Sequence, residues 1–258
     1  MNNRFAFLLF FPILFLCVSC NNRDNHSQQD NIINNNKFID YQICDDSLNI
    51  PSSETILSKL FPNYNDATVS FASRILVDSS KLLFIELCHD YYIDLGCNFC
   101  LIDHYLLSEN NGDISIKNQV GITDTTLLAP QDADYDFNSK FVKIGPNSVA
   151  LLTNYFLTNQ SFSESMSLKL FETNKLSYLF GIETSFDNIM WNIDAPESYN
   201  NVVEIIPSNK EFYDLKVTHN NFEVKNLNTE TFDYDLIPCD SSVTNYVFSN
   251  LELQYVEQ

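Results

Sequence analysis

Hydrophobic and polar residues alternate with a period of two from residue 68 almost to the end of the chain. In one clear example, Met166, Leu168 and Leu170 alternate with serine and lysine. Alternation of this kind is typical of strands that have one face in the core and the other in water. The alternating segments are residues 114–120, 141–144, 149–157, 165–170, 176–182, 213–217, 222–224 and 232–236. The pattern predicts a mainly β protein, an antiparallel β-sandwich or an incomplete barrel.

Two segments, residues 71–78 and 82–88, are nearly continuous apolar runs and predict strands that are covered on both faces. Residues 99–108 are predicted to form the next strand. The sequence Asn110-Asn111-Gly112-Asp113 supplies residues that tolerate a positive φ and predicts a tight hairpin. Further turns are predicted at residues 145–148, 173–175 and 219–221.

One short N-terminal helix is predicted over residues 53–61. Ser52 or Ser53 can cap it, its apolar residues share one face, and Pro62 ends it. A second departure from the period of two is an irregular stretch at residues 185–199, which holds the single tryptophan, Trp191. We interpret Trp191 as a core residue rather than a ligand-stacking one. A boundary between sub-domains, if there is one, should fall near residues 192–201.

The first twenty residues have the pattern of an export signal. Arg4 precedes a short apolar run that ends at Leu16 and is followed by Cys17-Val18-Ser19-Cys20. A positive start, a short apolar core and a small residue before the polar break are typical of a removable signal, and the run is short for a membrane span.

Val18-Ser19-Cys20 resembles the lipobox of bacterial lipoproteins. The chain differs from the family at Cys17, where leucine is usual, although Leu16 is one position away. The resemblance is limited to residues 1–20. It implies that residues 1–19 form a signal peptide, that Cys20 carries a lipid, and that the mature protein is anchored to a membrane of the cell envelope, facing the periplasm or the cell surface.

Residues 20–40 are rich in asparagine and contain few apolar residues. Such a segment buries too little surface to offset the entropy of ordering, so we expect a flexible tether. Residues 41–258 are then expected to form a single mainly β domain. The chain has enough apolar residues to form a hydrophobic core, because hydrophobic residues make up 45% of it and aromatic residues 14%.

The chain is strongly acidic, with a formal net charge of −20. This charge disfavours nucleic acid and anionic headgroups as partners, and it leaves cations or basic partners as the favoured ionic ligands. The simpler interpretation is that the charge keeps an exported protein soluble.

Cysteine and histidine cluster in one segment, which contains Cys88, His89, Cys97, Cys100 and His104. A disulfide from Cys88 to Cys97 or Cys100 is the favoured interpretation, because thiols outside the cytoplasm tend to oxidise. A zinc site is the alternative, since the Cys-x-x-Cys spacing with a nearby histidine suits tetrahedral zinc. Apart from Cys20, five cysteines follow the signal, so at least one stays unpaired; the two outside the cluster are Cys44 and Cys239.

Three weaker candidates for chemistry remain. Asp132, Asp134 and Asp136 offer oxygen ligands for calcium, but the segment lacks the glycine and glutamate of an EF-hand loop. The acids and tyrosines of residues 90–94 could line a glycan-binding groove. His89, His104 and His219 invite a catalytic interpretation, yet no nucleophile motif accompanies them.

The sequence therefore predicts a lipid-anchored protein of the cell envelope whose β-rich domain acts as a binding or structural module, with an envelope protein or a glycan as its partner. No cofactor is expected beyond the zinc and calcium alternatives, and no catalytic residue is assigned. The alternatives are an exported hydrolase acting on glycans and a metal-binding protein that uses the segment from Cys88 to His104.

Overall fold

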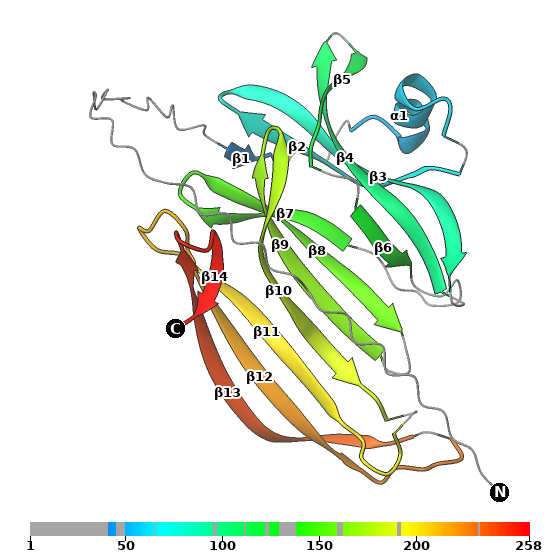
Figure 1. Ribbon diagram of the computed structural model, residues 1–258, viewed down its shortest axis with the longest axis vertical. Helices are drawn as coiled ribbons and strands as arrows, with labels where there is room; N and C mark the ends of the chain where they lie inside the picture. The colour runs from blue at the N-terminus through cyan, green and yellow to red at the C-terminus, as the bar shows by residue number, and fades with distance from the viewer. Residues whose placement is uncertain are drawn as a thin grey trace, which may run out of the picture. The chain divides into compact units, whose positions relative to one another are not determined.

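Long antiparallel strands make up most of the computed structural model (Figure 1). The structure describes residues 41–44, 50–64, 66–94, 97–110, 112–121, 124–128, 138–158, 162–189, 192–231 and 233–258. The chain divides into two units, Met1–Lys37 and Phe38–Gln258. The predicted signal peptide, the predicted lipid carrier Cys20 and the predicted tether lie outside the described residues. The strands and the helix all belong to the second unit.

The smaller of two sheets is built from the first part of this unit. Its order is β1-β2-β3-β4-β5, and β6 pairs with β4 next to the stretch that β5 covers. The strands are β1 (Tyr41–Ile43), β2 (Thr68–Val77), β3 (Ser80–Asp94), β4 (Cys97–Asn110), β5 (Asp113–Gln119) and β6 (Asp124–Leu128).

The larger sheet is a meander in which each strand pairs with the next along the chain. The strands are β7 (Asn138–Gly145), β8 (Ser148–Thr158), β9 (Phe162–Glu172), β10 (Lys175–Asp187), β11 (Ser198–Ile206), β12 (Asp214–Lys225), β13 (Asp235–Ser249) and β14 (Gln254–Glu257). In the described residues every strand pair of both sheets is antiparallel.

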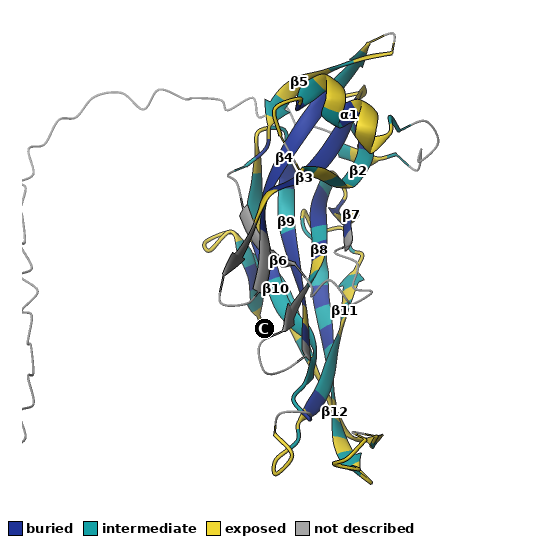
Figure 2. Ribbon diagram, turned by 90° about the vertical axis from the view of Figure 1, so that its right-hand side faces the viewer, coloured by how far each residue is buried: buried dark blue, intermediate teal, exposed yellow. Residues whose placement is uncertain are grey.

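The two sheets pack face to face across a shared apolar core. Phe84 of β3 is fully buried there, and its ring lies edge-on to Phe141 of β7 and Phe171 of β9, with ring centroids 4.9 and 5.8 Å apart. The buried members of this core are Ile75, Val77, Leu82, Phe84, Leu106, Val120, Phe141, Val149, Leu151 and Phe171. Figure 2 shows the buried positions running along β3, β4, β8 and β9. The predicted antiparallel β-sandwich is confirmed.

The single helix of the described residues, α1 (Ser53–Leu60), covers the opposite face of the smaller sheet. Ser52 caps it by accepting a hydrogen bond from the backbone of Thr55, as predicted, and Pro62 follows its end. Ile56 of the helix is fully buried among Leu83, Ile85 and Leu107. This explains why β3 reads as a continuous apolar run: both of its faces are covered.

The larger sheet curls, so that its last strands pack against its first ones. Phe180 of β10 lies edge-on to Tyr246 of β13, with ring centroids 5.0 Å apart, in a second core shared by the two halves of the sheet. At the end of β7 the backbone N–H of Tyr213 donates to the carbonyl of Ile144. Gly145 permits this approach, because a Cβ there would collide with the carbonyl oxygen of Glu211.

Most of the predicted strands, the helix and the hairpin at Gly112 are confirmed. The turn predicted at residues 219–221 is wrong, since these residues lie inside β12. The polar side chains that suggested a turn instead pair across neighbouring strands, as His219 with Asn201, Asn220 with Asn200 and Asn221 with Asp240. These hydrogen bonds let a polar segment continue as a strand.

The irregular stretch predicted at residues 185–199 is shorter in the structure. Strand β10 continues to Asp187, and β11 begins at Ser198 and pairs with both β10 and β12. The sequence pattern does not predict β1, β6, β11 or β14, and the strand predicted at residues 232–236 overlaps β13 only at its first two residues. Trp191 lies outside the described residues. In the part of the chain that the structure describes, no helix has the length and apolar character to cross a membrane.

Several tyrosines should resist ionisation in the folded protein. Burial, and then the carboxylate of Asp103, raise the pKa of Tyr105, while burial and the hydrogen bond to Asp187 raise the pKa of Tyr234 to about 12. Burial also raises the pKa of Tyr199 and Tyr255. Because the unfolded chain ionises its tyrosines near pH ~10 and the folded chain holds these protons, the stability they contribute is complete below pH ~10 and is lost as the pH rises further.

Near-ultraviolet titration tests this. Of the 13 tyrosines, the native protein should ionise a subset only well above pH ~10, whereas the urea-unfolded chain should ionise all of them together. The Tyr105→Phe variant should have one tyrosine fewer in the subset that ionises only well above pH ~10. Complete ionisation near pH ~10 with the native circular dichroism intact would contradict the burial described for these side chains.

Candidate functional site

The segment of β3 and β4 that holds the predicted cysteine and histidine cluster carries two polar groups on opposite faces of the smaller sheet. Residues two apart on a strand share a face, so Phe84, Glu86 and Cys88 point toward the larger sheet. Leu87 belongs to the opposite face, which packs against α1, and His89 follows it there. The adjoining strand β4 contributes His104 directly opposite Glu86.

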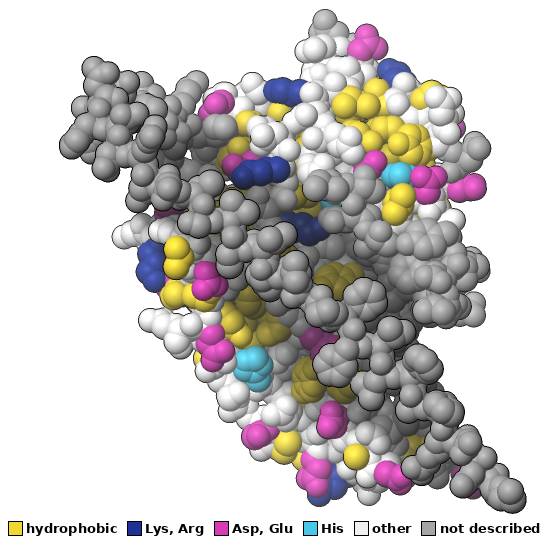
Figure 3. Space-filling view, in the orientation of Figure 1, with side chains coloured by type: hydrophobic (Ala, Val, Ile, Leu, Met, Phe, Trp, Pro, Cys, Tyr) yellow, Lys and Arg dark blue, Asp and Glu magenta, His cyan; other side chains and the backbone are white. Residues whose placement is uncertain are grey.

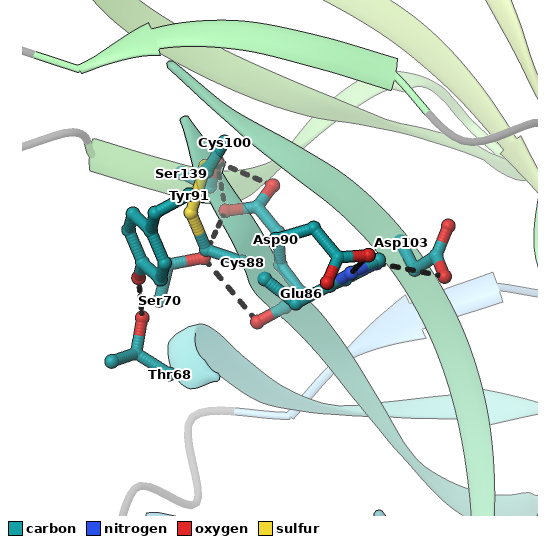
Figure 4. Close-up of a disulfide and its surroundings, with 10 residues drawn as sticks. Thr68, Ser70, Glu86, Cys88, Asp90, Tyr91, Cys100, Asp103 and Ser139 are labelled. Carbon is teal, nitrogen blue, oxygen red and sulfur yellow. Dashed lines mark hydrogen bonds and ion pairs between the residues drawn. A yellow bond between two sulfur atoms is a disulfide. The ribbon is translucent and has the colours of Figure 1, made fainter. Parts of the chain in front are cut away.

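A disulfide joins Cys88 to Cys100 across the two strands (Figure 4), with Cα atoms 5.9 Å apart. Both cysteines are buried. Of the two partners predicted for Cys88, the structure pairs Cys100; the side chain of Cys97 lies outside the described ones. Cys44 is a partly buried free thiol and Cys239 an exposed one. Since Cys88 and Cys100 are bonded to each other, neither sulfur is a thiolate ligand for zinc.

Glu86 lies at the centre of the first polar group, and only 1% of its side chain is exposed. Its Oε2 is 3.1 Å from Nε2 of His104, which is also buried. Ser70 of β2 donates to its Oε1 at 2.8 Å, and Ser139 of β7 donates to its Oε2 at 3.1 Å. Figure 4 shows this carboxylate between the two serines, next to the disulfide. The group therefore links both sheets through one carboxylate.

His89 lies at the centre of the second polar group. Its Nδ1 is 3.0 Å from Oδ2 of Asp90, and its Nε2 is 3.2 Å from Oδ2 of Asp103, which also accepts a hydrogen bond from Tyr105. Both ring nitrogens of His89 therefore have a carboxylate oxygen within hydrogen-bonding distance. The ring of Tyr64 lies edge-on to the imidazole at 4.7 Å.

Asp90 interrupts the strand with a positive φ of 49°. The pairing of β3 with β4 shifts register between His89 and Tyr92, so Asp90 lies at a bulge. The carboxylate of Asp90 turns to His89, whereas the hydroxyl of Tyr91 is 2.6 Å from Thr68, on the other side in Figure 4. Asp90 and Tyr91 thus turn to different partners and do not line one common groove. The side chains of Tyr92 and Asp94 lie outside the described ones.

The three histidines named by the sequence all have polar partners. His89 and His104 contact carboxylates, and His219 in β12 contacts Asn201 and Thr244. Ser139 of the larger sheet donates to Glu86. The polar side chains on β3 and β4 therefore form hydrogen-bond networks, and these networks hold the strands and the two sheets together.

Among the described side chains, no group of three or more histidine, cysteine, aspartate or glutamate residues is arranged to hold a metal ion. The candidate calcium ligands Asp132, Asp134 and Asp136 lie outside the described residues.

Sequence reasoning missed Glu86, which organises the first network. The sequence does indicate that Glu86 is unusual, because it is the one charged residue inside the apolar run of residues 82–88. A buried charge is costly unless it is paired, so a charge in such a run indicates a partner elsewhere. Arg74 is a similar case, and it makes a two-point ion pair with Glu109 at 3.0 Å for each contact.

In comparisons with models of protein families, with curated proteins and with solved structures, nothing matched this chain.

Replacing Glu86→Ala should lower the free energy of unfolding by about 3–5 kcal/mol, because it leaves His104 and two serines without their buried acceptor. Glu86→Gln, which keeps the volume and one acceptor oxygen, should cost less. Urea unfolding measures both.

The matched control is Glu204→Ala. Glu204 forms an ion pair with Lys216 at 2.7 Å, but both side chains are substantially exposed, so its loss should cost less than about 1 kcal/mol. If Glu86→Ala proved as mild as Glu204→Ala, the Glu86 network would not hold the two sheets together.

Proposed function

We propose that the protein is a lipid-anchored binding module of the cell envelope: Cys20 carries the lipid, and the β-sandwich is held outside the cytoplasm. The observation that carries the proposal is the buried disulfide between Cys88 and Cys100. Disulfides of this kind persist in oxidising compartments and are rare in reducing ones. The predicted export signal, residues 1–19, and the disulfide in the domain behind it are separate observations that support the same location.

The arrangement of the domain supports binding rather than catalysis as its role. His89 and His104 each contact a buried carboxylate, which also accepts hydrogen bonds from serine or tyrosine hydroxyls beside it. Such networks rigidify a fold, and a rigid sandwich with a tethered attachment suits a module that presents a surface to a partner. The net charge of −20 keeps such a module soluble and away from anionic headgroups.

Metabolic labelling with a palmitate analogue tests the anchor in cells that produce the full chain. The wild-type protein should take up the label and partition into the detergent phase. Cys20→Ala should abolish both, because the acylated sulfur is removed. Cys17→Ala is the matched control: it changes a neighbouring cysteine inside the signal and should leave labelling intact. Retained label in Cys20→Ala, or a full-length chain that keeps residues 1–19 in the cytosolic fraction, would overturn the proposal.

A further inference from the structure

One face of the larger sheet carries a row of side chains that runs across four strands. In the register of the sheet Phe186 of β10 lies opposite Tyr199 of β11, Tyr199 opposite Asn221 of β12, and Asn221 opposite Asp240 of β13. Directly opposed residues of antiparallel strands share a face, so these four side chains form one line, here called the transverse row. With strands about 4.8 Å apart, the row is about 14 Å long.

The transverse row is accessible and chemically mixed. Phe186 and Tyr199 are partly buried and stack on each other, with centroids 5.2 Å apart and rings 19° from parallel. Asn221 and Asp240 are exposed, and the Asn221 amide donates to the carboxylate of Asp240 at 2.7 Å. One end of the row thus offers aromatic surface, and the other offers planar groups that donate and accept hydrogen bonds.

A chain of hydrogen bonds beside the transverse row holds a second set of side chains on the same face. Asn201 of β11 donates to the backbone carbonyl of Glu183, and its oxygen is 2.7 Å from Nδ1 of His219. Nε2 of His219 is 3.1 Å from the hydroxyl of Thr244. The simplest assignment is that Thr244 donates to the imidazole, the imidazole donates to Asn201, and Asn201 donates to Glu183. Each side chain is held in one orientation across β10 to β13.

Glu183 connects this chain to the transverse row. Its carboxylate accepts hydrogen bonds from the hydroxyl of Tyr199 and from Ser163 of β9, which is buried. The tyrosine ring is therefore fixed from its hydroxyl end and from its stacked partner Phe186. Figure 3 shows acidic and hydrophobic side chains mixed over the later strands of the larger sheet on the visible face. Aromatic and polar groups that are oriented in advance lose little freedom when a ligand binds.

The chemistry of this face selects a class of ligand. Asp240 and Glu183, together with the net charge of −20, disfavour phosphate, sulfate and other anions. A purely apolar partner would bury the exposed carboxylate of Asp240 and offer it no donor beyond the Asn221 amide that it already has. An uncharged sugar chain matches both ends, because its C–H faces pack on aromatic rings and its hydroxyls both donate and accept. The length of the row suits several linked rings rather than one.

We propose that the transverse row, Phe186, Tyr199, Asn221 and Asp240, is a binding site for a neutral oligosaccharide. Tyr199 supplies the stacking surface and Asn221 and Asp240 hydrogen-bond to ring hydroxyls, while His219 and Asn201 hold the neighbouring side chains in place. The site rests on the binding role proposed above, for which it supplies the ligand, but its geometry does not depend on the lipid anchor.

Affinity electrophoresis of the full chain in detergent tests the site. Native gels would contain one soluble neutral polysaccharide each: a β-glucan, an arabinoxylan, a galactomannan and an α-glucan, with heparin as a charged reference. The protein should be retarded in at least one neutral gel and not in heparin. Asn221→Ala should weaken that retardation about tenfold in apparent affinity, the usual effect of losing one hydrogen-bonding group. Tyr199→Ala should abolish it.

Asn220→Ala is the matched control. Asn220 is the neighbour of Asn221 on β12, points to the opposite face, and makes an equivalent amide hydrogen bond, to Asn200 at 2.8 Å. It should leave retardation unchanged, and circular dichroism of each variant shows whether the fold is intact. Tyr199→Phe, which keeps the ring, should retain part of the retardation if Tyr199→Ala proves unfolded.

Absence of retardation in every neutral gel, retardation in heparin alone, or equal losses in Asn220→Ala and Asn221→Ala would overturn the site. The outcome is independent of palmitate labelling, so a failure here leaves the lipid anchor standing, and a failure of labelling leaves the site standing.

Discussion

The packing of Phe84 between the two sheets is the contact on which the rest of the domain depends. Its ring meets Phe141 and Phe171 edge-on and lies nearly parallel to His104, with centroids 5.6 Å apart. Aromatic pairs at such distances and angles contribute beyond the area they bury. Because Phe84 and Glu86 are two apart on β3, the position of this ring also decides where the buried carboxylate lies. The apolar core and the polar network are thus consecutive parts of one interface.

The interface changes character along β3. It begins with aliphatic and aromatic side chains, continues with Glu86 and His104, and ends at the Cys88–Cys100 disulfide. A buried carboxylate of this kind adds little net stability compared with an apolar residue, but losing one of its hydrogen-bond partners is strongly destabilising. Here the partners come from β2, β4 and β7, so the network is satisfied only when the two sheets are in register. We infer that Glu86 specifies how the sheets are packed, while the rings around Phe84 supply most of the driving force.

The sequence predicted the class of fold because the two-residue period and the continuous apolar run of β3 follow directly from which faces are covered. It did not predict β11 or the continuity of β12. His219 and Asn221 were predicted to lie in a turn and Asn201 at a possible sub-domain boundary, and only their partners on neighbouring strands make them compatible with a sheet. The same side chains form or border the proposed glycan site. The choice of Cys100 as the partner of Cys88 was also out of reach, because it depends on the pairing of Cys88 with Ile102 and on the bulge at Asp90, which no local pattern reveals.

The core around Phe84 and the Glu86 network should make the two sheets one cooperative unit. Native-state amide hydrogen exchange along a denaturant series tests this most directly, because it gives a free energy of opening for each strand. We expect the slowest amides of β3 and β4 and those of β8 and β9 to share one free energy and one denaturant dependence, both equal to the values for global unfolding. Exchange of β3 and β4 at a distinctly lower free energy, while β8 and β9 stay protected, would show that the sheets open separately and would contradict a single cooperative unit.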